Sequence, residues 1–300
     1  MNFDETYIAI RQRNLLEIVD LSLHVIRDHF SKLVPLLLLG AVPFFILNHL
    51  IIGWMSTETY AIDYLPFYVW LMLVLVAVES QIATSFISYY LGQAIFEGSP
   101  GVWQTVKSTF KSCTYFLTLQ SVTRMVVPTV VVAALMCNSG VDDDTIVFGM
   151  FIVSLVAGLG LIVRAMRPFT AEVLLLERTP IREKPGIVHY SKRSKALHGN
   201  ASSELMSRFF LVLIIATPLS FMFYSVLMIT DDLLNLHIDS SQSLVRYYWP
   251  IALWLTAGIM AVVRFLSYID IRIRQEGWAV ELRVRAEAQR LQRRLDEPLI

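Results

Sequence analysis

The sequence predicts an all-α fold, namely a polytopic membrane protein with six transmembrane helices and amphipathic helices at both ends of the chain. Hydrophobic residues make up 55% of the 300 residues and charged residues only 17%, and the mean hydropathy is +0.57. Apolar runs recur that are too long for the core of a soluble protein. Although the net charge is zero, the charges are sorted by loop rather than mixed, as is typical of membrane proteins.

Six apolar blocks of about 20 to 25 residues are each long enough to cross a bilayer with some tilt. We place these spans near residues 33–54, 67–91, 112–136, 145–166, 209–229 and 248–268. Residues 33–268 then form the transmembrane domain, which contains a long basic loop at residues 167–208. The N-terminal segment is residues 1–32, and the tail is residues 269–300.

The charges of the loops predict the orientation. The loops at residues 55–66, 137–144 and 230–247 hold eight carboxylates and a single basic residue, Arg246. The other 24 of the 25 Lys and Arg residues lie in the remaining loops, at the ends of the chain or within spans. Because loops rich in Lys and Arg stay in the cytoplasm, we expect both termini and the 167–208 loop to be cytoplasmic.

Both ends of the transmembrane domain predict amphipathic helices. Asn14 followed by Glu17 resembles a capping box, and an apolar stripe follows at Leu15, Val19, Ile26 and Phe30. In the tail, a stripe accompanies two i,i+4 ion pairs, Asp270–Arg274 and Glu281–Arg285. We expect the first helix to lie at the membrane interface or to pack on cytoplasmic loops. The tail helix should lie on the inner leaflet or on the central loop.

Two charged side chains, Glu79 and Arg124, fall in the middle of predicted spans. Each lies 12 residues from the cytoplasmic end of its own span, at Leu91 and Ser112 respectively. A lone charge at the bilayer centre costs roughly 2.5–3.5 kcal/mol, so the matching depths predict an intramembrane ion pair. Such a pair fixes the register of two helices or, alternatively, forms part of an ion relay or substrate cavity.

Basic residues on the cytoplasmic side are candidate contacts for anionic lipid or for a protein partner. They are Lys192, Arg193, Lys195, Arg272 and Arg274. A solvated loop that only sets the orientation explains the same charges. His189 and His198 flank this part of the loop but are too few for a metal site. Cys113 and Cys137 would lie roughly 36 Å apart along one helix, which excludes a disulfide between them. With so few metal-binding side chains, we expect no metal and no other cofactor.

The motifs of common enzyme sites are missing from the sequence: there is no P-loop, no GxSxG, no HExxH and no cysteine metal pair. We therefore expect a non-enzymatic integral membrane protein and no nucleic-acid partner. The leading interpretation is a scaffold or subunit of a membrane complex, which engages an unidentified protein partner or anionic lipid at its cytoplasmic face. The alternative is a small transporter or lipid-handling protein with a cavity around Glu79 and Arg124.

Two stretches carry a resemblance to a known family. YYLGQAIFEGSP closes the second span, and YIDIRIRQEGW, Tyr268 to Trp278, follows the last one. With the N-terminal helix, they resemble bacterial six-span proteins related to the membrane domain associated with glycerophosphoryl diester phosphodiesterases. The sequence holds no counterpart of the catalytic barrel or its acidic metal ligands. The resemblance therefore implies an accessory or stand-alone membrane domain in a bacterial cytoplasmic (inner) membrane.

Overall fold

The structure is a computed structural model that describes residues 14–57, 59–96, 100–109, 121, 124–138, 143–177, 190–199, 202–234 and 241–276. These residues form helices and no strand, which confirms the predicted all-α fold. Five helical stretches are long and apolar enough to cross a membrane: Leu15–Ser56, Asp63–Ile95, Asp144–Met166, Ser202–Leu234 and Leu244–Arg274. In the third predicted span the structure describes a shorter apolar helix, Val126–Cys137, so the sixth crossing stays a prediction.

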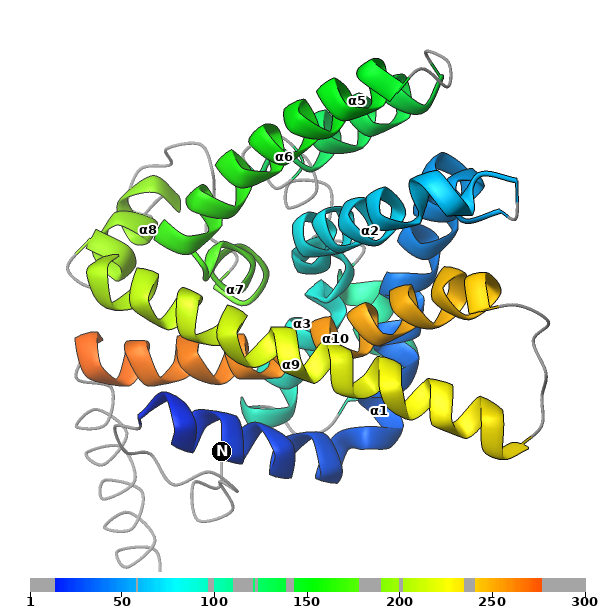
Figure 1. Cartoon of the computed structure of the whole chain (residues 1–300). Helices are drawn as coiled ribbons and strands as arrows, with labels where there is room; N and C mark the ends of the chain where they lie inside the picture. The colour runs from blue at the N-terminus through cyan, green and yellow to red at the C-terminus, as the bar shows by residue number, and fades with distance from the viewer. Residues whose placement is uncertain are drawn as a thin grey trace, which may run out of the picture.

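The helices form one bundle in which α10 is central (Figure 1), since α10 contacts α1, α2, α3, α8 and α9. The elements in chain order are α1 (Leu15–Ile52), the 3-10 helix η2 (Gly53–Ser56), α2 (Ala61–Ala83), α3 (Ser85–Phe96), α5 (Val126–Asn138), α6 (Asp143–Met166), α7 (Thr170–Leu175), α8 (Tyr190–Gly199), α9 (Ser202–Leu234) and α10 (Ser241–Glu276). We call the end at which α6 and α10 finish and α9 begins the basic end, and the opposite end the acidic end.

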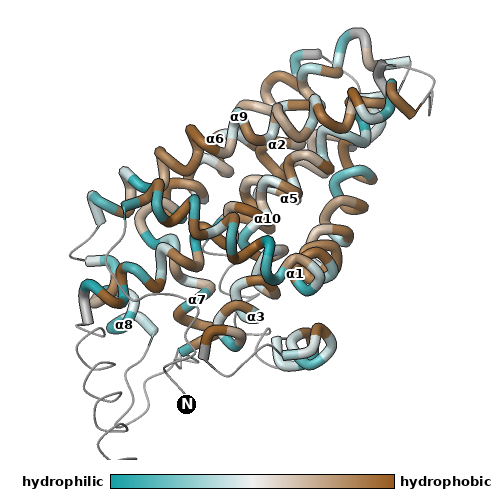
Figure 2. Tube along the Cα trace, turned by 90° about the horizontal axis from the view of Figure 1, so that it is seen from below, coloured by the Kyte–Doolittle hydropathy of each residue, from teal (hydrophilic) through white to brown (hydrophobic). Residues whose placement is uncertain are grey.

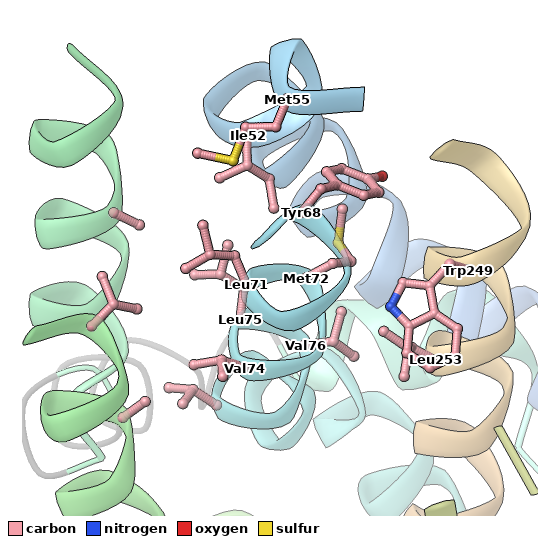
Figure 3. Packing of buried hydrophobic residues seen from close by; sticks show 14 of the residues in the cluster. Ile52, Met55, Tyr68, Leu71, Met72, Val74, Leu75, Val76, Trp249 and Leu253 are labelled. Carbon is pink, nitrogen blue, oxygen red and sulfur yellow. The ribbon is translucent and has the colours of Figure 1, made fainter. Parts of the chain in front are cut away.

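The main apolar core lies toward the acidic end, between α2 and its neighbours (Figure 3). Tyr68, Leu71, Met72 and Leu75 of α2 are each 0% exposed, and they belong to one cluster with Trp249 of α10. Lipid tails are as apolar as these side chains, so the gain comes from close van der Waals packing rather than from the removal of apolar surface from water.

Other helices leave large apolar side chains on the outside of the bundle. Figure 2 shows hydrophobic stretches along α6 and α9, and their exposed residues include Phe148, Phe151, Leu155, Phe210, Ile214 and Phe221. A soluble protein rarely exposes apolar surface on this scale. Together with the long apolar helices, this surface supports a multi-pass membrane protein.

The second predicted span is interrupted in its second half rather than forming one helix. Helix α2 ends at Ala83 and α3 begins at Ser85, while the Thr84 hydroxyl donates a 2.6 Å hydrogen bond to the carbonyl of Ser80. Gly40 of α1 packs directly on the break, because a Cβ atom there would collide with the carbonyl oxygen of Ala83. The break therefore lies at a close contact between two helix backbones.

The amphipathic ends are described only in part. Asn14 occupies the N-cap position of α1, as expected, but its side chain makes no capping hydrogen bond. Helix α10 continues past the predicted end of the last span to Glu276, and the predicted Asp270–Arg274 pair forms, at 3.0 Å. Residues 1–13 and 277–300 lie outside the described residues, so the rest of the tail helix, including the predicted Glu281–Arg285 pair, stays a prediction.

Candidate functional site: an arginine cluster at the basic end

The predicted ion pair between Glu79 and Arg124 is wrong, because the structure gives each residue other partners. Glu79 is fully buried in α2, and its Oε2 accepts a 2.8 Å hydrogen bond from the side chain of Asn48 in α1. Arg124 donates to the hydroxyl of Thr170, at 2.8 Å, and to the backbone carbonyl of Arg167. Both residues are described, and they are not bonded to each other.

The reason lies in the backbone just after Arg124. The prediction assumed one uninterrupted helix from Ser112, but α5 begins only at Val126 and Met125 has a φ of 56°, which a helix does not allow. The backbone of Arg124 packs against Gly160 of α6, where a Cβ atom would collide with the Arg124 carbonyl. Arg124 therefore lies before a helix start, and counting residues along a helix does not give its depth.

Arg124 instead lies near two other arginines and a buried carboxylate. It donates to Thr170 of α7, Arg264 pairs with Glu172 of the same helix, and Arg164 interacts electrostatically with Arg124, Arg264 and Glu172. We call Arg124, Arg164 and Arg264, together with Glu172, the arginine cluster. Glu172 of α7 is 0% exposed, and its Oε1 accepts hydrogen bonds from Arg264 Nε at 2.9 Å and from the Ser88 hydroxyl at 3.0 Å. Its second oxygen, Oε2, is buried and has no hydrogen-bond partner among the described residues.

The interrupted α2–α3 segment supplies most of the polar surface that faces the cluster. Arg164 Nη1 donates to the carbonyl of Ala77 at 2.6 Å and to the hydroxyl of Ser80 at 2.9 Å. Arg264 Nη2 donates to the Ser88 hydroxyl at 3.1 Å. The run from Glu79 to Ser88, ESQIATSFIS, thus places its small hydroxyl side chains where α6 and α10 approach it.

The cluster carries an excess of positive charge. Arg124 is 3% exposed, the Arg264 side chain is 10% exposed, and Arg164 is partly buried. The charge of Arg164 interacts with those of Arg264, Arg124 and Glu172, and Arg124 also interacts with the exposed Arg167. Arginine does not lose its proton in proteins, so three cations share one carboxylate.

His198 of α8 lies beside this cluster and is held neutral. Burial holds the pKa of His198 at about 4, below the ordinary 6.5; the hydrogen bond to the Ser194 carbonyl opposes the shift, and the charges of Arg124 and Arg167 add to it. The ring packs on Phe169 with centroids 5.7 Å apart. Since Nδ1 donates to the carbonyl of Ser194 at 2.8 Å, Nε2 is left as a buried acceptor, and it has no partner among the described residues.

A second polar network ties α8 and the residues after α7 to α10. Glu177 accepts hydrogen bonds from Arg193 Nε at 2.5 Å and from the Tyr268 hydroxyl at 2.7 Å, and Arg272 lies 3.6 Å away. Burial alone would raise the pKa of Glu177, but the hydrogen bonds from Arg193 and Tyr268 and the charge of Arg272 lower it below its ordinary value.

The end of α10 is also tied to the start of α9. Asp270 pairs with Arg208 at 3.0 Å, and Glu204 pairs with Arg274 at 2.7 Å. Of the predicted lipid or partner contacts, Arg193, Arg272 and Arg274 are therefore engaged in ion pairs within the chain, while Lys192 and Lys195 are exposed on α8. The Tyr268–Arg274 part of the motif that carries the family resemblance makes these contacts.

Sequence reasoning missed most of the cluster. Arg164 and Arg264 lie inside predicted spans, and ionisable residues inside spans could have been noted for that reason alone. Glu172 does not stand out in this way, because it lies outside the predicted spans, in the loop at residues 167–208, and reaches the cluster only through α7. His189 and Cys113 lie outside the described residues.

Side chains of this cluster can bind and orient an anion, since guanidinium groups and hydroxyls donate hydrogen bonds. Within the described part of the chain, no group of three or more His, Cys, Asp or Glu side chains is placed to hold a metal ion. Comparisons of the chain with family models, with curated proteins and with solved structures gave no match.

Proposed function

We propose that the protein is a lipid-handling membrane protein that binds the polar head of an amphiphilic ligand in the arginine cluster. The observation that supports this function is the convergence of polar side chains from α2, α3, α6, α7 and α10 at one place in an otherwise apolar bundle. A bundle that serves only as an anchor has no need of so many buried polar groups, each of which is unfavourable in a membrane unless it is paired.

The position of the cluster suits an amphiphile. Arg164 lies two residues before the end of the span Asp144–Met166, and Arg124 lies two residues before the start of α5. Lipid head groups lie at the level where spans end, and the surrounding helices expose apolar side chains that acyl chains can contact. Arg164 and Arg264 are partly exposed, whereas Arg124 and Glu172 are buried.

A test is purification of the protein in mild detergent, followed by delipidation and native mass spectrometry. We expect the wild-type protein to retain one amphiphile per chain. Ser88→Leu, which inserts an apolar side chain next to Glu172, should abolish retention. Ser220→Leu is the matched control, because Ser220 is also a buried serine but is bonded to Thr256 between α9 and α10. A wild-type protein that retains no amphiphile would refute this function.

A scaffold function is the second candidate, and the network around Glu177 and Asp270 favours it. These ion pairs hold α8, α9 and α10 together as one surface at the basic end, with Lys192 and Lys195 exposed on it. A scaffold predicts that the same purification yields a stoichiometric protein partner, which is lost when both lysines are replaced by Glu.

A further inference from the structure

We infer that the head group held by the arginine cluster is a phosphate-bearing anion, bound directly by Arg124, Arg164 and Arg264. The inference rests on the proposed function and specifies the chemistry of its ligand. Three features of the cluster support it: its charge balance, its unused hydrogen-bond donors and acceptors, and the geometry of guanidinium groups.

The charge balance calls for additional negative charge. Arg264 pairs with Glu172, the charges of Arg124 and Arg164 act on the same group, and Arg167 adds a further positive charge; among the described residues, Glu172 is the carboxylate that interacts with both Arg124 and Arg164. Glu79 does not supply the missing charge, since its described partner is Asn48. Buried charges without a counter-charge are strongly unfavourable, so a ligand with one or two negative charges stabilises the folded protein when it binds.

The unused hydrogen-bonding atoms indicate where the ligand binds. Arg124 is held by Thr170 and by the carbonyl of Arg167 through Nη2 alone, while its Nη1 is buried and has no partner among the described residues. Arg164 uses Nη1 for both of its hydrogen bonds. Two acceptors also have no partner among the described residues, Glu172 Oε2 and His198 Nε2, and each can accept from an O–H group of the ligand.

Phosphate matches this set better than a carboxylate does. Guanidinium groups bind phosphate through paired, charge-assisted hydrogen bonds. A carboxylate has only two oxygens for three arginines, whereas a phosphate monoester presents three free oxygens and up to two negative charges. A phosphate monoester that keeps one proton can also donate a hydrogen bond from its P–OH group to Glu172 Oε2. The same chemistry is found in a lipid head group and in a free phosphate.

The test compares ligands that differ only in phosphate. Phosphatidic acid and diacylglycerol with identical acyl chains are titrated against the delipidated full-length protein by native mass spectrometry. We expect phosphatidic acid to bind at least about tenfold more tightly, because each hydrogen bond to a charged group contributes about the free energy of a tenfold change or more. Displacement by inorganic phosphate would assign the site to free phosphates, and lack of displacement to the lipid head group.

Variants locate the effect in the cluster. Arg164→Gln should weaken phosphatidic acid binding about tenfold or more and leave diacylglycerol binding unchanged, while Arg164→Lys, which keeps the charge, should recover part of the loss. Arg246→Gln is the matched control, since Arg246 lies at the acidic end, where its Nη2 donates to His49. A second control, Lys192→Gln with Lys195→Gln, removes surface charge only. Thermal unfolding verifies that each variant is folded.

Distinct results overturn the inference and the proposed function. Equal binding of phosphatidic acid and diacylglycerol would overturn the phosphate inference and leave lipid handling intact. A loss that follows the two lysines and not Arg164 would also overturn it, because the anion would then bind at the surface of α8. If neither lipid binds, the phosphate inference is overturned, and if the purified wild-type protein also retains no amphiphile, the proposed function itself is refuted.

Discussion

Removing the carboxylate of Glu172 should destabilise the protein more than removing its partner Arg264. Glu172 is 0% exposed, and among the described residues it is the carboxylate whose charge acts on both Arg124 and Arg164 and which pairs with Arg264. Glu172→Gln keeps the shape of the side chain but leaves the three cations without a counter-charge. Breaking a buried pair in this way costs about 3–5 kcal/mol.

Arg264→Met, by contrast, leaves Glu172 with the positive charges of Arg124 and Arg164. The variant loses the hydrogen bonds from Arg264 to Glu172 and Ser88, at 2.9 and 3.1 Å, each worth about 1.5–3 kcal/mol, but it also removes one of the three mutually repelling cations, which offsets part of this loss. The double variant should be no less stable than Glu172→Gln alone, because it also removes one of the repelling cations. The two residues should therefore be coupled by more than about 1 kcal/mol, within the usual range for contacting residues.

Unfolding in mixed micelles of mild detergent and SDS, followed by tryptophan fluorescence, measures these differences. Asp63→Asn is a suitable control, because Asp63 is an exposed carboxylate at the acidic end. Equal destabilisation by Arg264→Met and Glu172→Gln would contradict this prediction. A double variant whose loss of unfolding free energy equals the sum of the two single losses within about 0.5 kcal/mol would contradict it as well.

Three further predictions concern packing, pH and orientation. Gly40→Ala should cost about 1–3 kcal/mol through overpacking, measured by the same unfolding assay, whereas Gly158→Ala should cost nothing, because no atom lies within 4 Å of the added Cβ; equal effects would contradict the described packing. Burial lowers the pKa of His198 to about 4. Between about pH 6.5 and pH 4, His198 is therefore protonated in the unfolded chain but neutral in the folded protein. Stability should therefore be full above pH 6.5 and fall by up to about 3 kcal/mol toward pH 4, and His198→Gln should reduce this dependence; an unchanged dependence would contradict it. Reporter fusions after Lys195 and Asp232 should report cytoplasmic and external locations respectively, and an external report from Lys195 would contradict the predicted orientation.

Hydropathy predicts the long helices well, because the length and apolar character of a span are local properties of the sequence. Each of the five described membrane-length helices contains one predicted span, and the first begins well before it, at Leu15. The break at Thr84 is not predictable in the same way, since no proline marks it. It depends on a hydroxyl that bonds back to Ser80 and on the close approach of Gly40 from another helix.

The site shows the same division between local and long-range information. The sequence indicates that Glu79 and Arg124 are unusual, and both are indeed buried. Their predicted pairing depends on equal depth in two continuous helices, and this condition fails beside Met125, which has a φ of 56°. The actual partner of Arg264, Glu172, lies in the polar connection predicted at residues 167–208, and only the fold of α7 back into the bundle brings it to Arg264.

The most direct test of lipid handling through the arginine cluster is a high-resolution experimental structure of the protein purified with its native lipids. We predict density for a phosphate group within hydrogen-bond distance of Arg124 Nη1, which has no partner among the described residues, and contacted also by Arg164 and Arg264. A map in which the three arginines are well ordered and contact only protein groups and water would contradict this central claim.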